Sequence, residues 1–259
     1  MSDAVTAKDT VVLVHGLWMH GWVMKLMGMR LRRCGFHPVS FSYPSMRSSL
    51  SQNALLLSHF VAGIATPRVH FIGHSLGGLL VLQMLAEYPE KRTGRVILAG
   101  SPYNASCVAT RLSRRGPGRY MLGRSMLQWL AQKTPEGSAQ YELGVIAGCR
   151  SMGGGRLIFR LPQPNDGVVT VEETQMPDIS DRIVLNVSHS GMLLSAGLAR
   201  QACSFLRSGY FCTIRNHYPD SGGSCFSAHF QLNAMIPQRL FCHLTSTFLV
   251  NSLQLPDPG

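Results

Sequence analysis

Short apolar runs, rich in β-branched residues, alternate along the chain with longer segments whose apolar residues recur at helical spacing. The runs indicate buried strands, because they are nearly continuous in apolar residues and too short for helices. They cover residues 10–14, 38–43, 68–72 and 95–99. Helices are predicted at 22–33, 50–64 and 76–88, each long enough to cross back over a sheet. This alternation predicts an α/β fold, with a mostly parallel sheet and helices on both faces.

The alternation breaks after Gly100 and resumes near residue 142. Residues 103–140 are rich in Arg and Gly and then become apolar at roughly helical intervals. We predict a small helical cap insertion there, overhanging the carboxyl ends of the strands; the alternative is an amphipathic helix packed on the domain. Further strands are predicted at 142–147 and 182–187, and a closing helix at 191–206.

One domain is predicted over residues 1–211, because the pattern is complete before the remainder begins. The tail, residues 212–259, has weak periodicity and no clear element, so its structure is doubtful and an altered reading frame or a fusion scar could have produced it. The tail carries side chains of the types that zinc prefers, but at spacings that match no compact zinc pattern, so we predict no metal site. These residues are Cys212, His217, Cys225, His229, Cys242 and His243.

A net charge of +11 is the main departure from ordinary composition, and it belongs to residues before 212, since the tail has equal numbers of acidic and basic residues. Basic residues concentrate in the predicted cap. They are Arg111, Arg114, Arg115, Arg119 and Arg124. A solvated basic face is the favoured interpretation, although such a cluster could make peripheral contact with an anionic membrane surface. Nucleic acid is not predicted as a partner, because no aromatic interleaving or nucleic-acid motif accompanies the arginines.

The seven cysteines include no C-x-x-C pair and are odd in number, which argues against a disulfide framework and predicts reduced thiols. Residues 1–10 carry two aspartates and no apolar run, so no signal peptide is predicted. The longest apolar stretch is interrupted by glycines and polar residues and does not resemble a transmembrane helix. A cytoplasmic protein is therefore the default prediction.

The strongest chemical signal is Ser75, in the G-x-S-x-G sequence of residues 73–77. A nucleophilic serine needs a sharp strand-to-helix turn, and flanking glycines relieve the crowding which that turn creates. The motif alone is weak. Its context strengthens it, because a predicted strand precedes it and a predicted helix follows it. We therefore predict that Ser75 is a nucleophile.

A second signal, His15-Gly16-Leu17, directly follows the first predicted strand. The glycine would let the backbone turn so that the next N–H points into the site. The N–H groups of Leu17 and Leu76 would then form a two-donor oxyanion hole. The alternative is an ordinary β-turn with a buried His15.

A general base and its orienting acid should follow the serine in the order acid, then histidine. Asp166 and His189 fit, because each follows a late predicted strand and so lies at the same sheet edge as Ser75. Asp178 or Asp181 could serve as the acid instead. The competing interpretation of His189 is a loop histidine with a structural role.

Together, these four motifs resemble those of bacterial lipases and carboxylesterases of the α/β-hydrolase fold, over about residues 10–211. The resemblance implies ester hydrolysis through an acyl-enzyme: Ser75 attacks, His189 takes its proton, and Asp166 holds the imidazole. It implies a small-molecule ester with an apolar acyl group as substrate, and it requires no cofactor. The tail has no counterpart in that family, and the family's first two strands have no obvious equivalent in this chain before Thr10.

Two other classes of function remain open. A thioesterase, amidase or acyltransferase could use the same triad, because cap and pocket shape decide which bond is cleaved. A catalytically inactive hydrolase fold could act as a binding protein, which the arginine cluster would suit. The intact set of Ser75, Asp166 and His189 weighs against the second class, since a scaffold has no need for all three.

Overall fold

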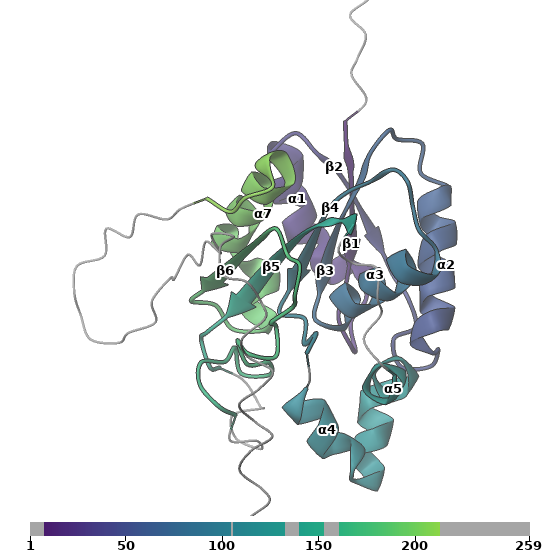
Figure 1. Ribbon diagram of the computed structural model, residues 1–259, viewed down its shortest axis with the longest axis vertical. Helices are drawn as coiled ribbons and strands as arrows, with labels where there is room; N and C mark the ends of the chain where they lie inside the picture. The colour runs from purple at the N-terminus through teal and green to yellow at the C-terminus, as the bar shows by residue number, and fades with distance from the viewer. Residues whose placement is uncertain (1–7, 105, 133–139, 153–160, 213–259) are drawn as a thin grey trace, which may run out of the picture.

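One six-stranded parallel sheet forms the centre of the computed structural model, which describes residues 8–104, 106–132, 140–152 and 161–212 (Figure 1). The strand order is β2-β1-β3-β4-β5-β6, and every adjacent pair is parallel. The strands are β1 (Thr10–Val14), β2 (His37–Phe41), β3 (Val69–His74), β4 (Thr93–Ala99), β5 (Glu142–Gly148) and β6 (Asp181–Leu185). The predicted α/β fold is therefore confirmed.

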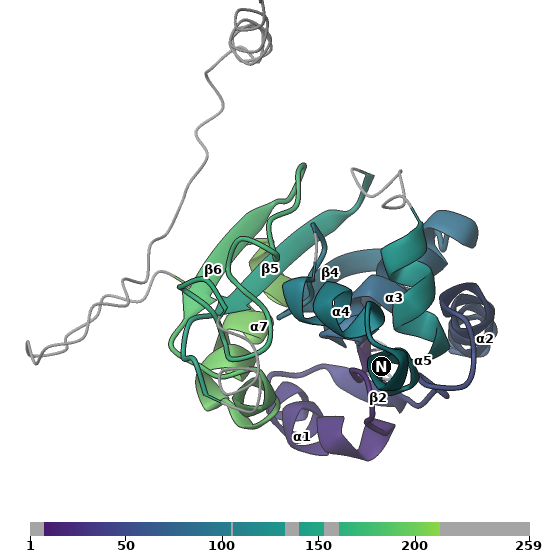
Figure 2. The ribbon, with the colours of Figure 1, turned by 90° about the horizontal axis from the view of Figure 1, so that it is seen from below.

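Helices cover both faces of this sheet, as the alternating pattern predicts. They are η1 (Gly21–Met24), α1 (Lys25–Arg33), α2 (Leu50–Ala62), α3 (Leu76–Glu87), α4 (Cys107–Ser113), α5 (Gly116–Ala131), η3 (Ser190–Leu194) and α7 (Ala196–Ser208), where η denotes a 3-10 helix. The core on one face is built from α2, α3 and α5, and the core on the other from α1, η3 and α7. Figure 2 shows these two layers on opposite sides of the sheet.

The strands are apolar almost throughout because each buries both of its faces. In β1, Val12 and Val14 pack into the core beneath α2 and α3, whereas Val11 and Leu13 pack beneath α1. All four side chains are at most 1% exposed. Burial of this kind is the main favourable contribution to folding and fixes the sheet as a rigid platform.

The two cap helices, α4 and α5, lie beyond the carboxyl ends of the strands (Figure 1). The described part of the predicted insertion at 103–140 thus contains two helices. Ser106 caps α4 by accepting a hydrogen bond from the N–H of Ala109 at 3.2 Å. Gly123 interrupts α5 with φ of 65°, which kinks the helix. The apolar face of α5 is anchored in the core by Leu122 and Met126.

A disulfide joins Cys34, at the end of α1, to Cys203 in α7. The two Cα atoms are 6.3 Å apart, within the range that a disulfide spans. The prediction of reduced thiols is therefore wrong for this pair. Spacing along the chain gave no signal, because the cysteines are 169 residues apart and meet only when α1 and α7 pack on the same face. A cytoplasmic location, which also depended on the N-terminal sequence, stays a prediction.

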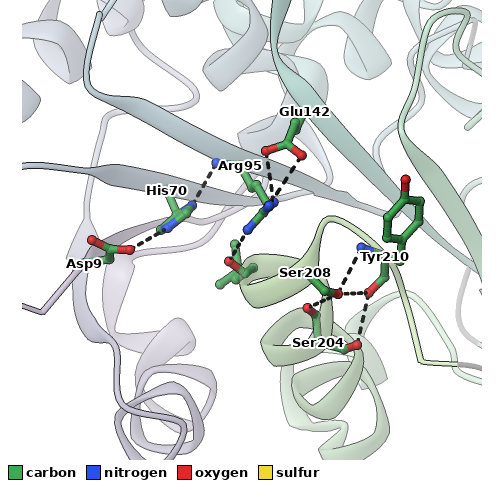
Figure 3. A network of polar contacts seen from close by, with 8 residues as sticks. Asp9, His70, Arg95, Glu142, Ser204, Ser208 and Tyr210 are labelled. Carbon is green, nitrogen blue, oxygen red and sulfur yellow. Dashed lines mark hydrogen bonds and ion pairs between the residues drawn. The ribbon is translucent and has the colours of Figure 1, made fainter.

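A polar network closes the amino-terminal edge of the sheet, opposite the cap (Figure 3). Buried His70 of β3 accepts a hydrogen bond at Nδ1 from the N–H of Arg95 (2.8 Å) and faces the Asp9 carboxylate at 3.4 Å. The Arg95 guanidinium donates to the carbonyl oxygen of Leu206 in α7 (2.9 Å) and pairs with Glu142 (3.1 Å). These contacts tie β3, β4, β5 and α7 together at the edge away from Ser75.

The zinc-type side chains of the tail, apart from Cys212, lie outside the described residues.

Candidate active site

Ser75 stands at the turn from β3 into α3 with φ of 54° and ψ of −125°. Residues other than glycine rarely adopt positive φ, and such backbone strain is characteristic of functional turns. The Ser75 N–H donates to the carbonyl oxygen of Ala99, at the end of β4, across 2.9 Å. The turn is therefore held between the ends of β3 and β4, in the strand–turn–helix arrangement that the predicted nucleophile elbow requires.

Glycines let three backbone segments meet at this turn. A Cβ on Gly77 would stand 2.3 Å from the carbonyl oxygen of Val14, at the end of β1, so no larger residue fits without movement. A Cβ on Gly16 would stand 3.1 Å from the Cβ of Ser75 and 3.2 Å from Nδ1 of His74. The loop after β1 consequently runs directly alongside Ser75.

The two predicted oxyanion donors, the N–H groups of Leu17 and Leu76, belong to the segments that meet at this turn. Leu76 is the first residue of α3, where backbone N–H groups have no intrahelical acceptor. Leu17 follows Gly16, where an added Cβ would stand 3.1 Å from the Cβ of Ser75. The loop is secured behind these residues by His15: the Tyr43 hydroxyl donates to the His15 carbonyl oxygen (2.9 Å), and the Tyr43 N–H donates to Nε2 of His15 (3.2 Å). Burial lowers the pKa of His15.

Asp166 and His189 meet in a buried pair at the same edge of the sheet. Nδ1 of His189 donates to Oδ2 of Asp166 at 2.7 Å. The other carboxylate oxygen of Asp166 accepts from the N–H groups of Val168 (2.9 Å) and Val169 (2.7 Å). The backbone adds another link, since the His189 N–H donates to the carbonyl oxygen of Asp166 at 2.9 Å. The side chains are 1% (Asp166) and 8% (His189) exposed, so this pair is shielded from water.

His74 connects the elbow to this pair, a role that the sequence did not suggest. Its Nε2 donates to the carbonyl oxygen of His189 (3.0 Å), and its ring centroid lies 4.8 Å from that of His189. Burial and the neighbouring His189 lower the pKa of His74 to about 3, so its ring is neutral at pH 7. In the described part of the chain, Ser75 Oγ makes no hydrogen bond with His189. Such bonds often tighten only when substrate binds.

The competing acids lie elsewhere. Asp178 is exposed and has a positive φ of 54°. Asp181 accepts hydrogen bonds from the N–H groups of Arg182 and Phe211, both at 2.7 Å. Only Asp166, among these three candidates, contacts His189. Among the described residues, no group of three or more His, Cys, Asp or Glu side chains is arranged to hold a metal ion.

Residues 11–160 match the alpha/beta hydrolase family. The chain belongs to this family. The match includes the loop after β1, the elbow and the described cap helices, and it ends before Asp166 and His189. No curated protein sequence matches the chain.

Solved structures share the fold of this alpha/beta hydrolase at low sequence identity. The metagenomic carboxyl esterase MGS0156 is 21% identical with a TM-score of 0.55, over 71% of this chain and 65% of that one. The lipase BlEst2 of Bacillus licheniformis, in its propeptide form, is 17% identical with a TM-score of 0.60, over 86% and 54%. An esterase (EaEST) from Exiguobacterium antarcticum is 13% identical with a TM-score of 0.58, over 79% and 94%. The chain spans less than two thirds of the length of the first two, and the likeness establishes the fold alone.

The arginine cluster of this alpha/beta hydrolase lies on the outer surface of the cap helices, where all five side chains belong to exposed residues. This placement fits the solvated basic face that the sequence favours, and nothing in the comparisons supports membrane contact. In the described ranges, no helix combines the length and apolar character needed to cross a bilayer.

A separate groove of about 470 Å³ runs between η1, α1 and the outer strand β2. Its lining includes Trp22, Lys25, Arg32 and His37, all of them exposed, and none of the predicted catalytic side chains. The groove is therefore distinct from the candidate active site at the carboxyl edge of the sheet.

Proposed function

We propose that this chain is a serine hydrolase that cleaves an ester bond of an apolar acyl substrate through an acyl-enzyme intermediate. The observation that carries the proposal is the buried hydrogen bond between Asp166 and His189, at the sheet edge where Ser75 occupies a strained elbow. A buried carboxylate that accepts from Nδ1 fixes the imidazole tautomer with its Nε2 unprotonated, which is the form a general base needs.

In the proposed reaction, Ser75 Oγ attacks the ester carbonyl carbon while His189 Nε2 takes the hydroxyl proton. The N–H groups of Leu17 and Leu76 stabilise the oxyanion that forms. His189 then gives the proton to the departing alkoxide, the ester C–O bond breaks, and the acyl group stays on Ser75. Water attacks the acyl-enzyme with His189 again acting as base, and the carboxylic acid leaves as Ser75 regains its proton. This chemistry uses side chains and backbone alone and needs no cofactor.

Apolar side chains at the cap support an apolar acyl group in the substrate. Trp18 of the loop after β1 is 58% exposed, and Tyr120 and Met121 of α5 are 85% and 48% exposed. Apolar groups left in water are stabilised when an apolar ligand covers them. We therefore propose that the described helices of the predicted insertion at 103–140, α4 and α5, line the acyl side of the site.

The proposal is tested with Ser75→Ala and a matched control, Ser101→Ala. Ser101 is also a buried serine close to α3, and its hydroxyl has no hydrogen-bond partner among the described residues. We expect Ser75→Ala to lose hydrolysis of a short p-nitrophenyl ester and labelling by a fluorophosphonate, whereas Ser101→Ala keeps both. Unaltered turnover in folded Ser75→Ala would contradict the proposal.

Two further results would revise the proposal, one from the same assays and one from a panel of substrates. A folded wild-type chain that neither labels nor hydrolyses the ester would support the inactive binding protein instead. A panel of esters, thioesters and amides with a common acyl group tests the bond itself, and a strong preference for thioesters would overturn the assignment to esters.

A further inference from the structure

Trp18, in the loop after β1, has a strained backbone conformation and a long-range side-chain hydrogen bond, and a surface loop requires neither. Its backbone has φ of 61°, a conformation that is strained for a bulky residue. Its indole N–H donates to the carbonyl oxygen of Met121 across 2.7 Å, joining residues 103 positions apart. The strained backbone directs the side chain out of the loop after β1 and onto α5. A hydrogen bond therefore links this loop to the cap.

The rest of α5 is fastened to a different part of the domain. After the kink at Gly123, the N–H of Arg124 donates to the carbonyl oxygen of Met46 (3.0 Å). Ser125 Oγ donates to the carbonyl oxygen of Ser48 (2.8 Å) and accepts from Nδ2 of Asn53 (2.9 Å). These contacts hold the second half of α5 to α2 and the loop before it. The first half, which precedes the kink, meets the loop after β1 through Trp18.

Trp18 directly follows Leu17, whose N–H is one of the two proposed oxyanion donors. On the other side of Leu17, Tyr43 holds the carbonyl oxygen and ring of His15. The loop that carries the donor is thus anchored at both ends, to the sheet through His15 and to the cap through Trp18. An oxyanion hole depends on donors held in place before the reaction, so an anchor next to a donor affects the transition state more than the bound substrate.

We propose that Trp18 is a positioning residue that couples the cap to the oxyanion hole. This inference rests on the serine-hydrolase function proposed above. The hydrogen bond from the indole N–H to the carbonyl oxygen of Met121 holds the loop against α5. This contact keeps the neighbouring Leu17 N–H directed at the developing oxyanion. An acyl group bound against α5 therefore contacts the same helix that holds the loop of the Leu17 N–H in place.

The test compares Trp18→Phe with Trp22→Phe. Phenylalanine keeps an aromatic ring but removes the indole N–H. Trp22 is a matched control, because it is a 74% exposed tryptophan four residues further along and lines the separate groove. Turnover of a p-nitrophenyl ester, affinity for a trifluoromethyl ketone that forms a tetrahedral adduct with the serine, and the thermal midpoint are measured for both variants.

For Trp18→Phe we expect kcat to fall about tenfold or more, below the ~10²–10³-fold cost of removing an oxyanion donor outright, with KM within about twofold. Affinity for the trifluoromethyl ketone should fall by a similar factor, because the adduct uses the same donors. Trp22→Phe should match the wild type in all three measurements. A merely structural role for Trp18 would instead lower the thermal midpoint and leave kcat and the ketone affinity of the folded protein unchanged, which would overturn the inference.

A second variant, Gly123→Ala, tests the same connection from the side of the cap. Gly123→Ala places a Cβ 2.6 Å from the Cα of Met46 at a residue with positive φ, so the kink must shift. Kinetic losses from Gly123→Ala and Trp18→Phe should not add in the double variant, because both break one connection. Fully additive losses would contradict the coupling. If Gly123→Ala does not fold, the comparison of Trp18→Phe with Trp22→Phe decides alone.

The failure of this inference differs from the failure of the proposed function. Were the serine-hydrolase function wrong, wild type and Ser75→Ala would show the same hydrolysis and labelling. Were only the coupling wrong, Ser75→Ala would be inactive while Trp18→Phe behaved like Trp22→Phe.

Discussion

His189 is restrained at three points. Its ring nitrogen and its backbone N–H both donate to Asp166, and its carbonyl oxygen accepts from His74. A general base held in this way loses little entropy on reaching the reactive orientation. Asp166 is the partner that fixes which ring nitrogen carries the proton, so it is the residue whose chemistry matters most to the proposed base.

Asp166→Asn should separate that chemistry from packing. An amide of the same shape can donate to Nδ1 and favour the wrong imidazole tautomer, so we expect kcat for ester hydrolysis to fall by about 10⁴-fold with KM little changed. Steady-state kinetics on a p-nitrophenyl ester measure this. Asp178→Asn, at an exposed aspartate, is the control and should retain wild-type kcat. Equal activity in the two variants would remove Asp166 from the proposed triad.

At the scale of elements, the site depends on how closely α3 approaches the end of β1. Gly77→Ala would place a methyl group 2.3 Å from the carbonyl oxygen of Val14, which is backbone and cannot turn aside. We expect the free energy of unfolding to fall by about 1–3 kcal/mol, the usual cost of overpacking, and kcat to fall because Leu76 moves with the helix. Urea titration and ester hydrolysis measure the two effects.

Gly116→Ala is the control for that prediction. A Cβ at Gly116, the first residue of α5, meets no atom within 4 Å. Its stability and activity should stay close to wild type, and any change in stability should be a small gain, since alanine is the better helix former. A Gly77→Ala protein as stable and active as this control would show that the close approach is not needed.

Sequence reasoning worked best for the elements that bury apolar residues. The run before the elbow was predicted as a strand at 68–72 and is β3, because a strand buried on both faces has to be apolar throughout. The helix predicted at 22–33 instead begins with a 3-10 turn, η1, before α1. Helix ends depend on local hydrogen bonds that apolar spacing does not encode.

The sequence did not predict contacts between side chains that are far apart along the chain. The residue types and order of the candidate site pointed to Ser75, Asp166 and His189, whose roles stay predictions. The hydrogen bonds of His74 to His189 and of Trp18 to Met121 span 115 and 103 residues. They depend on how completed elements pack, so no local pattern could reveal them.

At the scale of the whole molecule, the disulfide between Cys34 and Cys203 joins helix α1 to helix α7. Helix α1 follows the loop of Leu17, and α7 follows the loop of His189, so the bond links helices that flank two parts of the candidate site. Other contacts lie alongside it: a guanidinium N–H of Arg30 donates to the carbonyl oxygen of Leu194 (2.7 Å). Because the bond closes a loop of 169 residues, it restricts the unfolded chain strongly.

The Cys34→Ser/Cys203→Ser double variant should therefore lose about 3–5 kcal/mol of unfolding free energy. Urea titration of wild type and variant, each with and without a reducing agent, measures the loss. Reductant should destabilise the wild type more than it destabilises the variant, because only the wild type has the bond between Cys34 and Cys203 to lose. Equal stability of the oxidised wild type and the variant would contradict the expectation.

Buried neutral histidines make the stability of the whole molecule sensitive to acid. Burial lowers the pKa of His74 to about 3, whereas an unfolded histidine titrates near 6.5. As the pH falls below about 6.5, His74 binds a proton in the unfolded chain but not in the folded protein. The free energy of unfolding therefore falls until the pH reaches the pKa of His74 in the folded protein. At pH 5 the loss from this one residue is about 2 kcal/mol relative to pH 8. Burial lowers the pKa of His15 and of His70 as well, which acts in the same direction.

His74→Gln isolates the contribution of that residue, because the glutamine amide can still donate to the carbonyl oxygen of His189 but does not titrate. Urea titrations at pH 8 and pH 5 should show a drop in unfolding free energy that is about 2 kcal/mol smaller in the variant than in the wild type. The contributions of His15 and His70 cancel in this comparison, since both proteins contain them. His59→Gln, at an exposed histidine of α2, should keep the wild-type drop. An undiminished drop in His74→Gln would mean that the acid sensitivity arises elsewhere, and that His74 holds His189 in place without the large pKa shift that its burial implies.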